Sequence, residues 1–245
     1  MKASVSPATT IFALLALSCL TAIAQDVIVQ KDAQRREGQI TGVKADIVRI
    51  KIGPVDTGVP LTAIASVSMA PPKAFVETLA AWQAGETKKA LSLLTPLVAT
   101  FNGLPTKWAE RSSALLAEAL LADGQVAQAE TAFADFQKVY PDAASTADVG
   151  LARLAIEKKD FSGAREKLVP IVEKAKATKL AGPGDSTVFG QALYLLGQVH
   201  EASAENSEAL ENYLLVTSLF HEDKAVAQKA RARADALAEK SVIVP

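Results

Sequence analysis

The sequence predicts a mainly α protein, in which a stack of antiparallel helical hairpins follows a small all-β module. Between residues 73 and 240, apolar residues recur at spacings of three and four, the period of an amphipathic helix. Between residues 25 and 69, short β-branched runs alternate with polar residues, the period of a half-buried strand. Aromatic residues make up 5% of the 245 residues while alanine is abundant, a balance that favours helices packed closely through small side chains.

The first 24 residues are predicted to be a secretory signal peptide. Lys2 is the only charge before Asp26, and the apolar run between them ends in Ala22-Ile23-Ala24, the small-x-small pattern that signal peptidase reads. The run is shorter than the ~20 residues of a membrane-spanning helix. We therefore expect cleavage after Ala24, no integral membrane segment in the mature chain, and a periplasmic or cell-envelope location.

Cys19, the only cysteine, lies within this segment. The residues before it, Ala16-Leu17-Ser18, match the apolar box of a lipid-anchored export signal poorly, so lipid anchoring at Cys19 is not expected. Cleavage removes Lys2, which leaves 25 of the 26 basic residues against 27 acidic ones, a net charge of −2. This balance does not favour nucleic acid as a partner.

Residues 25–70 are predicted to form one small module of about five strands. In the run 46–52, Val48, Ile50 and Ile52 alternate with charged side chains. Further short strands are expected at 27–29, 38–43, 59–61 and 65–68, with turn signals at 53–54 and 56–58. Closure into a curled sheet or barrel removes exposed edges. The basic residues Lys31, Arg35 and Arg36 are interpreted as a solvated cluster in the first connection.

This segment resembles small barrels of the SH3-like or Sm-like kind. Their pattern of a glycine, x-I-x-G-V, an aspartate turn, a β-branched strand and I/V-P-L-x-x-I-x-x-V is found here at Gly38, 40–43, Asp46, 47–52 and 59–67. Sm-like proteins bind RNA, but residues 25–69 contain no aromatic side chain on which a base could stack. RNA binding is therefore not expected.

Residues 71–245 are predicted to form one helical domain. Pro71 and Pro72 remove backbone donors and end the last strand. Four hairpins are expected, each with a first and a second helix, at 73–84 with 87–101, 107–122 with 125–139, 146–158 with 161–176, and 187–203 with 206–220. A last helix, at about 222–240, is rich in charge and alanine and is interpreted as a solubilising cap.

The fourth hairpin carries the clearest repeat pattern. Leu196-Gly197 lies late in its first helix, Ala209 opens its second helix and Tyr213 follows one turn later. This arrangement resembles the tetratricopeptide repeat, whose small residues lie where the two helices cross closely. Over residues 73–240 the other hairpins repeat it in part. The second and third have alanine in place of the glycine, at Leu116-Ala117 and Leu151-Ala152, and the first lacks the pair. The equivalent alanines are Ala90, Ala129, Ala164 and Ala209.

The resemblance implies a non-catalytic adaptor or scaffold that binds a peptide or a helix of a protein partner in its concave groove. The first helix of each hairpin lines that groove in such arrays. Trp82 and Tyr194 are the expected anchors because aromatic residues contribute strongly to interfaces. The predicted groove residues are Trp82, Arg111, Glu118, Arg153, Glu157, Lys158, Gln191, Tyr194, Gln198 and Glu201.

No catalytic, cofactor or metal site is predicted. The two histidines, His200 and His221, lack metal-ligand spacing, and we interpret His200 as a packing residue. The sequence contains no phosphate-binding loop, no G-x-S-x-G elbow and no H-E-x-x-H. Two alternatives stay open, namely self-assembly by hairpins that stack between chains and a ligand-binding or enzymatic role for the β module. The module could also simply cap the first hairpin.

Overall fold

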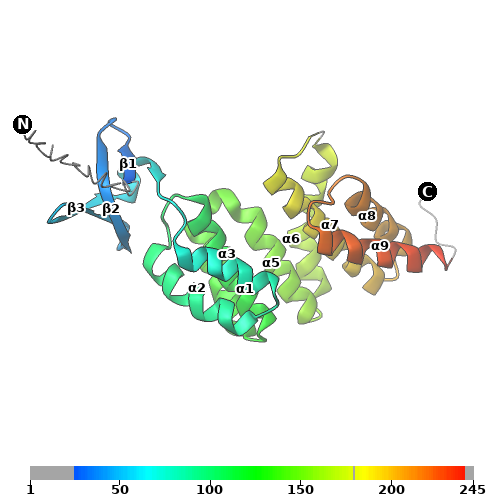
Figure 1. The fold of residues 1–245 in the computed structure, drawn as a ribbon. Coiled ribbons are helices and arrows are strands. Elements are labelled where there is room, and N and C mark those ends of the chain that lie inside the picture. The colour runs from blue at the N-terminus through cyan, green and yellow to red at the C-terminus, as the bar shows by residue number, and fades with distance from the viewer. Residues whose placement is uncertain (1–24, 179, 241–245) are drawn as a thin grey trace, which may run out of the picture.

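The computed structural model of the protein describes residues 25–178 and 180–240. It is an elongated array of helical hairpins with a sheet at one end and the last helix at the other (Figure 1). The fold is therefore the predicted α-solenoid preceded by an all-β segment. The predicted signal peptide and Cys19 lie outside the described residues.

The β segment is a five-stranded antiparallel sheet with the strand order β4-β3-β2-β1-β5. β4 and β5 are not paired with each other, so the sheet keeps two edges, and the resemblance to SH3-like or Sm-like barrels remains a prediction. A short 3-10 turn, Leu61–Ala63, separates these two strands. The strands are β1 (Asp26–Gln30), β2 (Arg35–Lys44), β3 (Ile47–Ile52), β4 (Val55–Pro60) and β5 (Ile64–Ser68).

Two expectations about this segment were wrong. Arg35 and Arg36 belong to β2 rather than to a turn, because that strand is ten residues long and its first part pairs with β1. Residues 56–58 lie inside β4, where they pair with residues 49–51 of β3. The turn predicted at 53–54 is correct, since only Gly53 and Pro54 lie between β3 and β4. The signal at 56–58 misled because that turn is tight and β4 begins directly after it.

Among the described residues, nine α-helices follow the sheet. Their hairpins match the predicted ones, but α7 begins four residues earlier than expected. Its first residue is Pro183, whose missing N–H is not needed in a first turn. The helices are α1 (Lys73–Gln83), α2 (Thr87–Phe101), α3 (Lys107–Ala122), α4 (Val126–Val139), α5 (Ala144–Glu157), α6 (Phe161–Ala177), α7 (Pro183–Ala202), α8 (Asn206–Ser218) and α9 (Lys224–Ala238).

The four hairpin turns share one backbone conformation. Each contains a single residue at positive φ, at Gly85, Gly124, Lys159 and Ala204. The next residue donates its N–H to the carbonyl five positions back, as Glu86 does to Ala81 and Glu205 does to His200. This bond satisfies a carbonyl that the helix end would leave unpaired, so the turn reverses the chain in the same way each time.

A small residue lies twelve positions before the alanine of each second helix. In the fourth hairpin this residue is Gly197, and a Cβ there would lie 2.5 Å from a ring carbon of Tyr213. In the first hairpin it is Thr78, which is fully buried and donates its hydroxyl to the Ala74 carbonyl. Thr78 therefore replaces the Leu-Gly pair that the first hairpin lacks. The four pairs are Thr78 with Ala90, Ala117 with Ala129, Ala152 with Ala164, and Gly197 with Ala209.

A second close approach joins neighbouring hairpins. Gly150 of α5 packs on the ring of Phe133 of α4, where a Cβ would lie 2.1 Å from the nearest ring carbon. Both residues are buried. Because no hairpin can bury its own apolar face alone, contacts of this kind turn separate hairpins into one stack.

The sheet shares a hydrophobic core with the first hairpin and the start of α3. Trp108 of α3 is the centre of this junction. Its ring packs edge-on against Phe101 at 5.2 Å between centroids, and its indole N–H donates to the Met69 carbonyl at 3.2 Å. The shared core includes Ile28, Ile40, Val48, Ile50, Phe75, Leu97 and Leu104.

Gly42 brings the sheet against the helices. It lies at a bulge of β2 with φ +150°, and a Cβ there would lie 2.7 Å from the carbonyl oxygen of Thr100 at the end of α2. Only glycine fits both that backbone conformation and that approach. The sheet therefore covers the end of the array that α1 and α2 would otherwise expose.

We expect Gly197→Ala to lower the free energy of unfolding by about 1–3 kcal/mol, because the added methyl overlaps the buried ring of Tyr213. Gly184→Ala is the matched control, since a Cβ there has no neighbour within 4 Å and lies in the same helix. That control should raise the stability by up to about 1 kcal/mol. Urea unfolding measures both, and equal effects of the two substitutions would contradict the close crossing of α7 and α8.

Candidate protein-binding site

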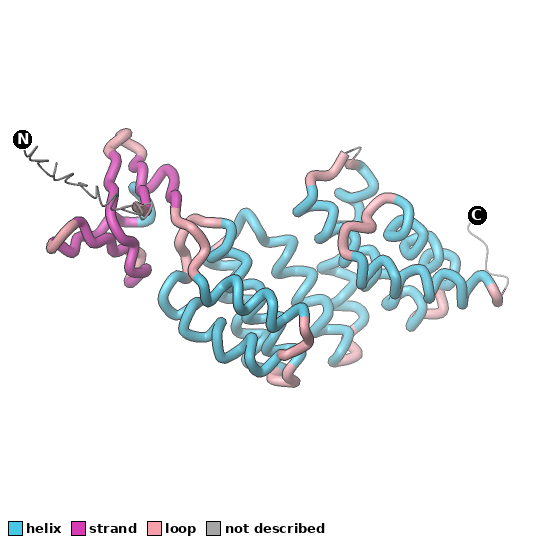
Figure 2. The backbone as a smooth tube through the Cα atoms, viewed as in Figure 1, coloured by secondary structure: helices cyan, strands magenta, loops and turns pink. Residues whose placement is uncertain are grey.

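The first helices of the hairpins lie on the inner side of the stack. α1 contacts α3, α3 contacts α5, α5 contacts α7, and α7 contacts α9, whereas the second helices make no comparable set of contacts among the described residues. In a curved stack the elements on the inner side approach one another most closely. We call the surface formed by α1, α3, α5, α7 and α9 the inner face. Figure 2 shows the helices of the stack joined by short loops, with the strands gathered at one end.

Glu201 of α7 ties three helices together. Its carboxylate accepts the hydroxyl of Tyr213 from α8 at 3.0 Å, and it accepts Nε of Arg233 from α9 at 2.9 Å. Its side chain is only 14% exposed. Burial, together with the neighbouring Glu201 carboxylate, raises the pKa of Tyr213 well above its ordinary value. The sequence predicted Glu201 as a groove residue, and the structure places it in this internal network.

Tyr194 and Gln198 lie together on α7, beside Arg153 of the neighbouring α5. The ring of Tyr194 packs on Tyr213 at 5.8 Å between centroids, and its hydroxyl accepts Nε2 of Gln198 at 3.4 Å. Burial raises the pKa of Tyr194, and the cations Arg233 and Arg153 oppose that shift. The three residues Arg153, Tyr194 and Gln198, which the sequence predicted for the groove, form a half-buried polar cluster.

Three more predicted residues form ion pairs within the chain. Arg111 pairs with Glu118 on α3 at 3.0 Å, which joins two predicted groove residues. Lys158 reaches back to Glu130 of α4 at 2.6 Å, so it serves the contact between neighbouring hairpins.

Gln191 donates to Asp223, the residue that caps α9, at 3.1 Å.

The remaining two predicted residues lie on other parts of the array. Trp82 of α1 is half-buried against the core of the first two hairpins, and Glu157 is exposed at the end of α5.

Sequence reasoning missed Arg233. It was assigned to a solubilising cap, but this largely exposed charged residue of α9 reaches the Glu201 carboxylate of α7. The available signal was the spacing of buried residues in that helix. Ala230, Ala234 and Leu237 are buried at helical spacing, which places Arg233 at the border of the packed face.

His200 takes part in a group of hydrogen bonds that connects the last two hairpins. Its Nδ1 is hydrogen bonded to the Glu205 carboxylate, which also accepts the guanidinium of Arg165 from α6 at 2.5 Å. The hydrogen bond from Arg165 lowers the pKa of Glu205 most, and the hydrogen bond with His200 lowers it further. His200 therefore takes part in the contact between the last two hairpins.

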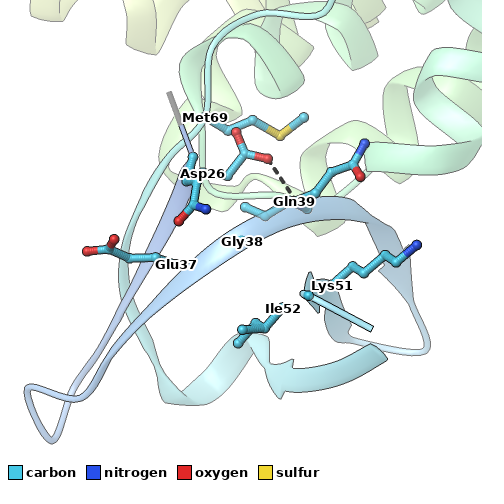
Figure 3. A pocket seen from close by; sticks show the side chains of 10 residues that line it. Asp26, Glu37, Gly38, Gln39, Lys51, Ile52 and Met69 are labelled. Atoms are coloured by element: carbon cyan, nitrogen blue, oxygen red, sulfur yellow. Dashed lines mark hydrogen bonds between the residues drawn. The ribbon is translucent and has the colours of Figure 1, made fainter. Parts of the chain in front are cut away.

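A separate cleft of about 630 Å³ opens on the β segment (Figure 3). It lies where β2 changes partner from β1 to β3. Asp26 stands at its side and accepts the backbone N–H of Ile40 at 2.8 Å. Its lining mixes charged and apolar side chains; the residues are Gln25, Asp26, Glu37, Gly38, Gln39, Ile40, Lys51, Ile52, Gly53 and Met69.

Among the solved structures that resemble the chain are two of a Podospora anserina putative kinesin light chain with nearly identical TPR-like repeats. The first is 19% identical with a TM-score of 0.46, covering 69% of this chain and 94% of that chain. The second, a variant of that protein with a glutamine replaced by methionine, is 20% identical with a TM-score of 0.48, covering 71% and 95%. At this identity the likeness concerns the fold alone.

No protein-family model and no curated protein sequence matches the chain. Within residues 25–178 and 180–240, the structure contains no helix with the length and apolar character needed to cross a bilayer.

The buried Tyr213–Glu201 contact leads us to expect that the stability of the fold depends on pH above about 10. Because the pKa of Tyr213 is raised in the folded protein, the folded state keeps a proton that the unfolded state loses above pH ~10. Stability should therefore fall as pH rises above about 10, by up to about 1.4 kcal/mol per pH unit from this residue. In urea unfolding between pH ~9 and ~11, Tyr213→Phe should show a shallower decline than the wild type; parallel declines would contradict the buried contact.

Proposed function

We propose that the protein is an exported, non-catalytic adaptor or scaffold of the cell envelope, which binds a segment of a protein partner on the inner face. The observation that carries the proposal is the half-buried cluster of Arg153, Tyr194 and Gln198 on adjacent first helices. Aromatic and arginine side chains contribute most to protein interfaces when they lie in partly desolvated surroundings. The curvature of a repeat stack also creates an extended concave surface that can bind a partner.

Two features of the array support this function over self-assembly by end-to-end stacking. The sheet covers one end through the shared core around Trp108. α9 covers the other end, and its exposed residues are charged, polar or small, including Arg231 and Asp235. An open stack needs apolar ends, so the surface left for a partner is the inner face rather than an end.

The cleft on the β segment is the second candidate, for the ligand-binding alternative. Its volume of about 630 Å³ lies in the usual range for small-molecule sites. Its polar groups are already used in part, since Asp26 accepts the Ile40 N–H and Glu37 pairs with Arg35 at 2.6 Å. We therefore rank it below the inner face.

Capture of partners from an envelope extract tests the adaptor proposal. We expect the double substitution Tyr194→Ala with Gln198→Ala to reduce recovery of the bound partner by about tenfold or more, the effect of losing an interface anchor. The matched control replaces Val169 and Leu214 by alanine, two exposed apolar residues of the second helices α6 and α8. A partner retained equally by both variants would exclude the inner face as its site, and circular dichroism checks that both variants are folded.

A further inference from the structure

Arg153 differs from every other half-buried charged residue that the structure describes. Each of the others has a hydrogen-bond or ion-pair partner, as Glu118 has in Arg111 and Arg165 has in Glu205. The Arg153 side chain has none among residues 25–178 and 180–240. A guanidinium without a partner keeps its N–H donors available for an anionic group of another molecule.

The carboxylates of Glu118 and Glu201, on the neighbouring helices α3 and α7, do not pair with Arg153. Glu118 is bound to Arg111, and Glu201 is bound to Arg233 and Tyr213. Glu157 lies one turn along the same helix but makes no ion pair with Arg153. The described surroundings therefore leave an unpaired positive charge on the inner face.

Further hydrogen-bonding groups lie beside it on α7. Tyr194 accepts from Gln198 at 3.4 Å, and the proton of its own hydroxyl has no acceptor in the described part of the chain. α5 and α7 pack against each other, and Arg153 is close enough to influence the pKa of the Tyr194 hydroxyl. A guanidinium presents paired N–H groups whose spacing matches the two oxygens of a carboxylate.

We propose that Arg153, with the Tyr194 hydroxyl, binds an aspartate or glutamate side chain within the partner's bound segment. This inference rests on the proposed function and names the chemistry of the partner at one position. α5 lies inside the stack, with α3 on one side and α7 on the other. A segment bound there can continue in both directions, which favours an internal acidic side chain over a chain-terminal carboxylate.

Short peptides test this chemistry without knowledge of the partner. Tetraglutamate blocked at both ends is titrated into the protein at low salt, and the NMR signals of the arginine Nε–H groups are followed. We expect the Arg153 signal to shift and saturate, and blocked tetraglutamine to leave it unchanged. Tetraglutamine with a free carboxyl end serves as the probe for a terminal carboxylate and should bind more weakly than blocked tetraglutamate.

Arg153→Gln should weaken tetraglutamate binding by about tenfold or more, the scale of losing a charge-assisted bidentate contact. Arg231→Gln is the matched control, because Arg231 is an exposed arginine of α9 whose loss makes the same change in net charge. The proposal is overturned if both variants bind equally, if blocked tetraglutamine binds as well, or if the free carboxyl peptide binds best.

Capture experiments with these variants distinguish a failure of this inference from a failure of the proposed function. If Tyr194→Ala with Gln198→Ala abolishes capture while Arg153→Gln leaves it unchanged, the inner face binds the partner but the acidic contact is wrong. If no inner-face variant affects capture, the proposed function fails regardless of the peptide result. Loss of capture in Arg153→Gln, with Arg231→Gln unaffected, is the outcome that we expect.

Discussion

The structure depends on a close crossing of two helices in every hairpin, which only a small side chain permits. Thr78, Ala117, Ala152 and Gly197 occupy that crossing, each twelve residues before the alanine of the second helix. At Gly197 even one methyl group would overlap the ring of Tyr213. The equal spacing of these pairs lets the hairpins stack in the same way, and the first helices meet on one side of the stack.

A stack of this kind has two ends that must be covered, and the chain covers them differently. At the first end the sheet contributes its core residues to the same cluster as Phe75 and Trp108, and Gly42 allows it to touch α2. At the other end α9 packs through Ala230, Ala234 and Leu237, and Arg233 fixes it to Glu201. Both ends are covered, and our proposal therefore assigns the partner to the inner face. Arg153 lies there as the half-buried charged group without a counterion among the described residues.

The sequence predicted the hairpins because their apolar spacing and small residues are local signals. The start of α7 was missed because Pro183 and Gly184 are turn formers that a first helical turn also accepts. Arg35 and Arg36 were misplaced because charge alone does not distinguish a turn from an exposed strand. In the predicted groove, the sequence identified Arg153, Tyr194 and Gln198, which the structure brings together. It could not show that Glu201 is used internally, since its partner Arg233 lies 32 residues away in another helix.

Hydrogen exchange on the complex with a captured partner tests the central claim most directly, because it maps the bound surface without any substitution. Binding on the inner face predicts added protection in α5 and α7, with α6 and α8 unchanged. Protection confined to the sheet around Asp26, Gly38 and Ile52 would contradict the account and assign the function to the β cleft.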